Sequence, residues 1–283
     1  MSLWLADELH VSLSPTQVGV VRVQRRLGLR GARRRVVAKQ SLPCDPNSQA
    51  FAWGGALRTL DTLLPQCLDG CPNVVMVLSN HFVHYALVPW SDLISSDEEQ
   101  LDYARHCFQM TYGATVATWA LRLSRATVGA SQLASAVDEQ LLVACNEAVT
   151  RHGLRLTSVQ PYFMSAFNRL KCQIHQPDAW VALAEPGCIC LARLHQGQWI
   201  RFRAARLANG WAEFARFLVR EAFMGNSELQ AEEQVLYVYA AHFGGLQTIS
   251  GWNIFELSAP LPPELPEEED TSLVMALSGQ ISG

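Results

Sequence analysis

The chain has 283 residues, of which 49% are hydrophobic and only 17% are charged. This length allows one large domain or two lobes, and the composition predicts a well-filled core and excludes a disordered chain. The formal net charge of −4 argues against bulk attraction to nucleic acid. The sequence has no apolar run of about 18 residues that would span a membrane, and its start, MSLWLADELH, lacks the pattern of a signal peptide. We therefore expect a cytoplasmic protein.

The eight cysteines form no recognisable metal-binding pattern. Cys67 and Cys71 have three residues between them and Cys44 lies upstream, but a second matching pair of thiols is missing. Cys188 and Cys190 alternate along an expected strand, with no histidine beside them in the sequence. We expect the cysteines to be reduced residues of the core, and we expect no metal site.

The first part of the chain is predicted to hold a hairpin, a third strand, a helix and a strand pair. The stretch Leu9–Gln24, LHVSLSPTQVGVVRVQ, predicts a strand, a polar turn over Ser14–Gln17, and a returning strand. A third strand is expected over residues 36–42, and apolar spacing predicts a helix over Phe51–Leu64. The strongest strand signal, Asn73–Trp90, divides at a short turn.

The middle of the chain alternates helices and single strands. Ser96, followed by three acidic residues, predicts a helix start, and Gly113 marks the end of that helix. The next expected elements are a strand, a helix, a short strand and a second helix, over Thr115–Ser124, Leu133–Gly153, Leu154–Gln160 and Tyr162–Leu170.

The last part of the chain begins with another antiparallel strand unit. Its expected strands, Trp180–Ala192 and Gln198–Arg206, lie on either side of the turn His195–Gln198. A helix, a strand, an exposed loop rich in proline and glutamate, and a short final helix are expected after it, with the first three over Trp211–Phe223, Gln234–Ala241 and Pro260–Asp270.

The order of elements is similar in the two halves, because each opens with antiparallel strands and closes with a helix and a strand. This repetition predicts an α/β protein with two similar lobes, residues 1–174 and 175–283, which face one another across a cleft. The first hairpin, Ser12–Val18, and a second turn, Glu185–Leu191, are expected to lie on opposite sides of that cleft.

A cluster of basic residues stands out in the first lobe. It supplies 7 of the 22 lysines and arginines within 15 positions, namely Arg25, Arg26, Arg30, Arg33, Arg34, Arg35 and Lys39. The flanking strands place it in an exposed loop or at a sheet edge. One interpretation is a solvated hairpin tip, and the other is a surface for an acidic partner or for the anionic inner leaflet of a membrane. Nucleic acid is not expected, because no aromatic residues are interleaved with the arginines.

Three segments of the sequence carry a resemblance to a known family. They are LHVSLSPTQVGVVRV from Leu9, LLVACNEAVTRHGLRLTSVQPYFMSAFNRL from Leu141, and WVALAEPGCICLARLHQGQWIRFRAARLANGW from Trp180. Together they resemble the actin-like ATPase superfamily, and within it the PilM family of type IV pilus assembly proteins, MSHA-type pilus biogenesis proteins and the cytoplasmic domain of the GspL family of type II secretion.

The resemblance implies a two-lobed actin-like (ribonuclease H-like) fold with duplicated mixed sheets. It also implies a scaffold that is cytoplasmic and peripheral to the inner membrane. The implied partner is the cytoplasmic N-terminal segment of a bitopic inner-membrane pilus or secretion protein.

The sequence departs from this family at the nucleotide-binding loops. The resemblance places an aspartate and a glycine, for metal and phosphate, where this chain has Ser12 and Ser14, with Thr16 in the same turn. In the second turn Glu185 and Gly187 flank Pro186, whose nitrogen cannot donate to a phosphate. The glycine pair of the adenosine side corresponds to Gly244 and Gly245.

These departures predict a protein that is not an enzyme and has no cofactor. One alternative is an ATPase or a sugar-kinase-like phosphotransferase with divergent phosphate loops, which would bind ATP and magnesium. Another is an unrelated α/β enzyme without a recognisable motif, because the sequence has no Gly-x-Ser-x-Gly elbow.

Overall fold

The computed structural model describes residues 7–28, 31–45, 51–67, 70–207, 210–225, 234–240, 245–265 and 270–279, with only the backbone for 25–28 and 31–34. The chain forms two compact units. Unit 1 contains Met1–Val83, Val137–Arg169 and Ala259–Gly283, and unit 2 contains His84–Ala136 and Leu170–Ser258. The two units are grouped by contacts in space and each contains separate stretches of the chain. The lobes expected from the sequence, 1–174 and 175–283, follow chain order, and that boundary stays a prediction.

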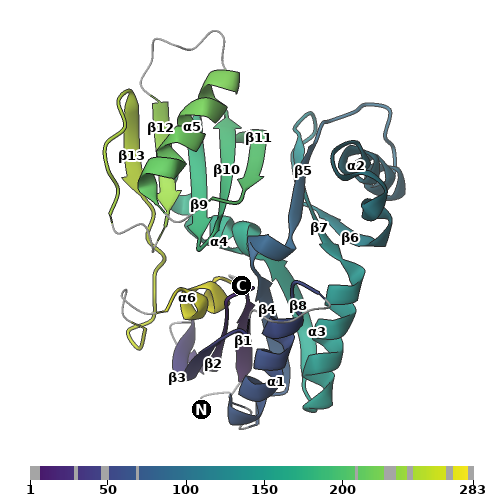
Figure 1. Ribbon diagram of the computed structural model, residues 1–283, viewed down its shortest axis with the longest axis vertical. Helices are drawn as coiled ribbons and strands as arrows, with labels where there is room; N and C mark the ends of the chain where they lie inside the picture. The colour runs from purple at the N-terminus through teal and green to yellow at the C-terminus, as the bar shows by residue number, and fades with distance from the viewer. Residues whose placement is uncertain are drawn as a thin grey trace. The chain divides into compact units, whose positions relative to one another are not determined.

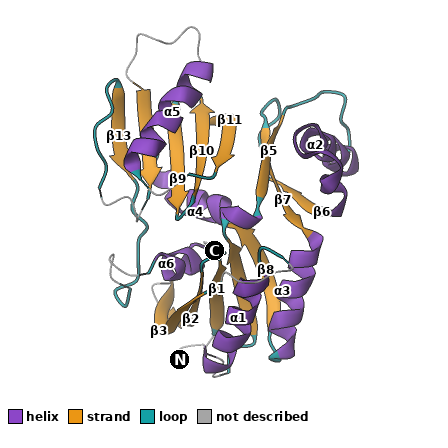
Figure 2. Cartoon of the chain, in the orientation of Figure 1, coloured by secondary structure: helices purple, strands orange, loops and turns teal. Residues whose placement is uncertain are grey.

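Unit 1 is built on a five-stranded mixed sheet in the order β3-β2-β1-β4-β8, labelled in Figure 1 and drawn in orange in Figure 2. The strands are β1 (Glu8–Leu13), β2 (Gln17–Gly28), β3 (Gly31–Pro43), β4 (Asn73–Leu78) and β8 (Arg155–Pro161). Strands β1, β2 and β3 are antiparallel neighbours, whereas β4 is parallel to both β1 and β8. The first hairpin and the third strand expected from the sequence are therefore confirmed.

Four helices belong to unit 1, namely α1 (Gly54–Cys67), α3 (Glu139–Arg151), α4 (Tyr162–Leu170) and α6 (Thr271–Ser278). Helices α1 and α6 contact opposite faces of the sheet, because neighbouring rows of a sheet point to opposite sides. Ser12, Gly19 and Ser41 are register partners on β1, β2 and β3 and form one row across the sheet. This row contacts α6, because the Ser12 hydroxyl donates to the Ser272 carbonyl and the Ser41 hydroxyl donates to the Asp270 carboxylate. The adjacent row contains Gln40, which bonds to Gln66 of α1.

Helix α6 is fixed by a cap that also bonds to the sheet. Asp270 accepts a hydrogen bond from the backbone nitrogen of Ser272 at 2.9 Å, which caps the helix. The same carboxylate accepts hydrogen bonds from the Ser41 hydroxyl, at 2.5 Å, and from the Gln17 side-chain amide. Gly19 permits this close approach, because a Cβ there would lie 2.7 Å from the hydroxyl oxygen and 2.9 Å from the carbonyl carbon of Ser272.

Unit 2 contains a second five-stranded sheet, in the order β11-β10-β9-β12-β13. Its strands are β9 (Ala179–Glu185), β10 (Cys188–His195), β11 (Gln198–Ala205), β12 (Gln234–Tyr239) and β13 (Trp252–Glu256). Three antiparallel strands are followed by two parallel ones, as in unit 1, so the expected duplication of mixed sheets is confirmed. Helix α5 (Trp211–Gly225) covers one face through Phe214, Phe217 and Leu218, which pack on Ile189 and Leu191 of β10.

A three-stranded sheet, in the order β5-β7-β6, completes unit 2. It consists of β5 (His84–Val88), β6 (Trp119–Leu123) and β7 (Gln132–Asp138). Phe108 of α2 (Asp97–Tyr112) lies in the core between this helix and the sheet. The expected start of α2 is confirmed, because the Ser96 hydroxyl accepts the backbone nitrogen of Glu99 at 3.2 Å. Three short 3₁₀ turns, Asn80–Phe82, Gly113–Thr118 and Lys171–Gln173, join elements of the chain.

Three sequence-based predictions are corrected by the structure, and one strand was missed. The expected helix Leu133–Gly153 begins only at Glu139, because residues 132–138 form the central strand β7. The expected strand Thr115–Ser124 begins at Trp119 after a 3₁₀ turn. The expected strand Trp180–Ala192 is two strands that meet at Pro186-Gly187, and β13 was not expected at all.

Replacement of Asp270 by alanine should destabilise the protein more than the loss of an ordinary cap. The substitution removes the cap of α6, which costs about 1 kcal/mol, and it leaves Gln17 and Ser41 without their acceptor, at about 1 kcal/mol or more. Chemical denaturation should show a loss of about 2–3 kcal/mol in the free energy of unfolding.

The matched control is Asp138→Ala, because Asp138 caps α3 through the backbone nitrogen of Gln140 at 2.8 Å. This variant should lose only about 1 kcal/mol. Equal losses for the two variants would show that the contacts of Asp270 with the sheet contribute nothing to stability.

Candidate functional site

The turn of the first hairpin is closed by its own hydrogen bonds. The Ser14 backbone nitrogen and hydroxyl both donate to the Gln17 carbonyl, at 3.1 and 2.7 Å, and the Gln17 nitrogen donates to the Ser14 hydroxyl at 3.0 Å. The Thr16 carbonyl accepts the Cys44 nitrogen at 2.8 Å. Since Pro15 has no N–H, at least three of the four turn residues have no backbone donor to offer to a phosphate.

Ser12 lies in strand β1, at the position where the family resemblance places an acidic residue. Its side chain is fully buried, accepts the Gly19 nitrogen at 3.1 Å and donates to the Ser272 carbonyl of α6 at 2.7 Å. A carboxylate at this position would face the Ser272 carbonyl oxygen, and no hydrogen bond could form because both groups are acceptors. The site is therefore shaped for a hydroxyl and for the packing of α6.

The second turn joins β9 to β10 by two residues. Pro186 and Gly187 stand between the paired Glu185 and Cys188, and Gly187 has a φ of 77°, which fits a type II turn. Glu185 is buried. Burial raises the pKa of the Cys190 thiol, and the nearby Cys188 and the Glu185 carboxylate add to this rise. The buried Glu185 thus lies directly before the turn, and the turn itself is a two-residue loop, the commonest short connection in hairpins.

The structure groups the predicted nucleotide positions into two sets. Ser12, Ser14 and Thr16 lie together in unit 1, and Glu185 and Gly187 lie together in unit 2. The expectation that the two turns face one another across a cleft stays a prediction. Gly245 has a φ of 109°, which favours glycine, and Gly244 lies outside the described residues.

The basic cluster lies mostly in paired strands rather than in a hairpin loop, which corrects one of the two expected placements. Strand β1 pairs with β2 only as far as Val23, whereas β2 and β3 stay paired to Gly28 and Gly31. We call residues 24–28 and 31–35 the arginine ribbon. It holds Arg25, Arg26, Arg33, Arg34 and Arg35, and Arg30 lies outside the described residues.

The edge placement is confirmed for Arg33, Arg34, Arg35 and Lys39, because β3 is the outer strand of the described sheet, whereas Arg25 and Arg26 lie on its neighbour β2. Arg25 is the register partner of Arg34, and Arg26 of Arg33. Opposed like charges destabilise a strand pair by some tenths of a kcal/mol. At the base of the ribbon, Arg35 lies 3.6 Å from the Glu264 carboxylate, and the Lys39 ammonium donates to the Glu264 carbonyl at 2.9 Å.

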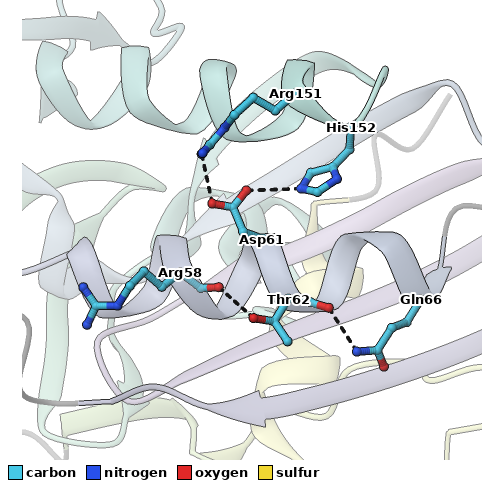
Figure 3. Close-up of polar contacts among 6 residues, drawn as sticks. All are labelled: Arg58, Asp61, Thr62, Gln66, Arg151 and His152. Atoms are coloured by element: carbon cyan, nitrogen blue, oxygen red, sulfur yellow. Dashed lines mark hydrogen bonds and ion pairs between the residues drawn. The ribbon is translucent and has the colours of Figure 1, made fainter.

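A second polar cluster joins helices α1 and α3 (Figure 3). Asp61 lies 2.9 Å from the Arg151 guanidinium and 3.2 Å from the His152 imidazole. A carboxylate–imidazole pair is part of many hydrolase sites, but the neighbouring Thr62 hydroxyl donates to the Arg58 carbonyl of its own helix at 3.1 Å. The described contacts of the cluster therefore link the two helices.

Sequence reasoning missed the part that α6 plays at the first hairpin. Asp270 and Ser272 supply its contacts, and the only local signal is the cap pattern at the start of a short apolar helix. Within the described ranges, no three histidine, cysteine or acidic side chains gather as metal ligands. No helix among those ranges is long and apolar enough to cross a membrane.

Comparisons with known proteins find similarity in structure but not in sequence. No protein-family model matches the chain. No curated protein matches it significantly either.

Solved structures do match most of the chain. A PilM-PilN type IV pilus biogenesis complex is 17% identical, with a TM-score of 0.57 over 82% of this chain and 81% of that chain. The cytoplasmic domain of EpsL, an inner-membrane component of the type II secretion system of Vibrio cholerae, is 12% identical, with a TM-score of 0.58 over 96% and 93%.

A Bacteroides thetaiotaomicron protein with an actin-like ATPase fold and unknown function is 9% identical, with a TM-score of 0.53 over 86% of this chain and 83% of that chain. All three matches have TM-scores above 0.5 and cover more than four fifths of this chain. The chain therefore has the two-lobed actin-like fold that the sequence predicts.

Proposed function

We propose that this protein is a non-catalytic, cytoplasmic scaffold of a type IV pilus or type II secretion assembly platform, peripheral to the inner membrane. In this role it binds the cytoplasmic segment of a membrane-anchored partner. The roles of two structural neighbours support the proposal. One belongs to a type IV pilus biogenesis complex, and the other is the cytoplasmic domain of an inner-membrane component of a type II secretion system.

The proposal that the protein is non-catalytic rests on the burial and hydrogen bonds of Ser12. Phosphoryl transfer in proteins depends on metal ions held by acidic side chains and on a cradle of backbone donors. Here the corresponding side chain is a buried hydroxyl that bonds to Gly19 and to α6. The turn beyond it uses its Ser14 and Gln17 nitrogens internally. Both features favour a binding body over an ATPase or a sugar-kinase-like phosphotransferase.

The partner contact is proposed to involve the arginine ribbon. The register of the two paired strands sets arginines at opposed positions. Like charges at opposed positions destabilise a strand pair, and an anionic partner would offset that cost. An acidic segment of the membrane-anchored partner, or anionic lipid beside it, has the required charge.

Magnesium-ATP should not stabilise the protein. A ligand present at about 100 times its dissociation constant adds about 2.7 kcal/mol to the free energy of unfolding, so even moderate affinity would raise the unfolding temperature by several degrees. We expect no shift in differential scanning fluorimetry, and no heat of binding in titration calorimetry with magnesium present.

A shift of several degrees with magnesium-ATP, absent with magnesium alone, would contradict the non-catalytic proposal and favour the ATPase alternative. Ser12→Asp should not create ATP binding. It should instead lower the free energy of unfolding by about 1–3 kcal/mol, since it places an acceptor against the Ser272 carbonyl.

Removal of three arginines from the ribbon should weaken partner or membrane binding without unfolding the protein. In Arg33→Ser/Arg34→Ser/Arg35→Ser, the only described ion pair lost is that of Arg35 with Glu264, whose arginine side chain is 69% exposed. Each cation near an anionic surface contributes about 1 kcal/mol. Co-purification with the membrane partner, or sedimentation with anionic vesicles, should fall roughly a hundredfold at low salt.

The charge-matched control is Arg58→Ser/Arg125→Ser/Arg155→Ser, three exposed arginines outside the ribbon. If both triple variants bind like wild type at low salt, the basic cluster is a solvated hairpin tip. If the ribbon variant fails to fold, these arginines are structural.

A further inference from the structure

One side of helix α5 exposes a continuous stripe that is both apolar and basic. The stripe consists of Ala212, Arg216, Val219, Arg220, Phe223 and Met224, all exposed and spaced as neighbours on one helical face. Phe223 is 73% exposed, Met224 67% and Val219 47%. Single exposed apolar residues are ordinary, but three adjoining ones at the end of one helix mark a contact surface.

The exposed stripe is not needed to hold α5 on its sheet. The opposite face of the helix already packs on the sheet through Trp211, Phe214, Phe217 and Leu218, which are all buried (Figure 1 shows α5 over the strands). Phe223 therefore lies on the outward side of the helix, and Met224, seven residues after Phe217, is exposed at its C-terminal end. Their exposure leaves apolar area that another surface can cover.

Among the described residues of unit 2 near the stripe, arginines outnumber acidic side chains. Glu221 is the acidic residue of α5 nearest to Phe223 in sequence, yet its side chain is only 7% exposed and lies 3.0 Å from Arg201 and 3.5 Å from Arg203. Arg220 also approaches this carboxylate, at 3.6 Å. Three guanidinium groups thus share one buried carboxylate. The exposed side of the helix itself carries Arg216 and Arg220 against one acidic side chain, the half-buried Glu213.

We infer that the α5 stripe docks on an anionic lipid surface. Phe223 and Met224 would enter the boundary between headgroups and acyl chains, and Arg216 and Arg220 would contact lipid phosphates. Basic residues beside bulky apolar ones on an exposed helical face are the combination that such surfaces attract. A second copy of the chain fits less well, because three large apolar side chains are far fewer than the roughly 20–30 residues a stable protein interface uses on each side.

This inference goes beyond the proposed partner contact and is independent of it, because the stripe lies in unit 2 and the arginine ribbon in unit 1. The lipid contact of two or three side chains would be weak alone. Added to a partner already anchored in the membrane, it would raise the local effective concentration and fix which side of unit 2 faces the lipid.

The test is sedimentation of the full-length chain with vesicles of phosphatidylglycerol and phosphatidylcholine, compared with vesicles of phosphatidylcholine alone. Wild type should bind the anionic vesicles and not the neutral ones. Phe223→Gln/Met224→Gln should lower the partition coefficient about tenfold or more, since burying either side chain is worth about 1.5 kcal/mol or more. Arg216→Gln should lower it about fivefold.

The matched control is Leu93→Gln/Val128→Gln, which removes two apolar side chains that are 92% and 85% exposed elsewhere in unit 2. It should bind like wild type, and all variants should keep the wild-type unfolding temperature. If the Phe223/Met224 variant does not fold, Arg216→Gln still decides the question.

The inference is overturned if wild type does not sediment with the anionic vesicles, or if Phe223→Gln/Met224→Gln or Arg216→Gln binds them like wild type. It is also overturned if wild type forms a dimer that the Phe223/Met224 variant loses while vesicle binding is absent. Co-purification with the membrane partner should be unchanged in this variant, so failure here and failure of the proposed function are distinguishable.

Discussion

The hydrogen bonds that join the row Ser12–Gly19–Ser41 to helix α6 are the constraint on which unit 1 depends. Ser12 and Ser41 reach the first turn of α6, and Asp270 both caps that helix and receives the sheet. Because Gly19 has no side chain, the helix lies directly on the strands. The side of the first hairpin that bears Ser12 is consequently covered by α6.

This arrangement shows how an actin-like body can keep its architecture while its loops change. The order of strands depends on buried apolar rows such as Val11 and Val20, which are independent of what the turns carry. The turns tolerate replacement, because each needs only to connect two strands. A serine in β1 and a two-residue Pro186-Gly187 turn satisfy that need as well as a phosphate-binding loop would. The packing of this fold thus does not require nucleotide-binding residues at these two turns.

The elements that could be predicted from sequence are those with strong local signals. The first hairpin alternates apolar and polar residues around a Ser-Pro turn, the capped start of α2 follows from Ser96, and α4 has the predicted bounds Tyr162–Leu170. Strand β7, QLASAVD, was taken for helix because its small alanines suit either structure and its strand partners lie elsewhere in the chain.

The contacts of α6 were beyond local reasoning for a different reason. Gln17 and Asp270 are 253 positions apart, and no spacing rule connects them. The arginine ribbon could be predicted only in part. Its charge and its flanking strands are visible in the sequence, but its length depends on how far β2 and β3 stay paired beyond β1.

The long separation between Ser12 and its partner has a consequence for the order in which the protein is made. Their hydrogen bond spans 260 positions, so α6 leaves the ribosome on the order of tens of seconds after the hairpin that it covers. During that interval the face of the nascent sheet that bears Ser12 has no helix on it, and its closure is a late, non-local step with a high cost in chain entropy. Unit 2 contains Leu170–Ser258 and is complete before α6 is synthesised. The unit that begins first is thus the one that finishes last.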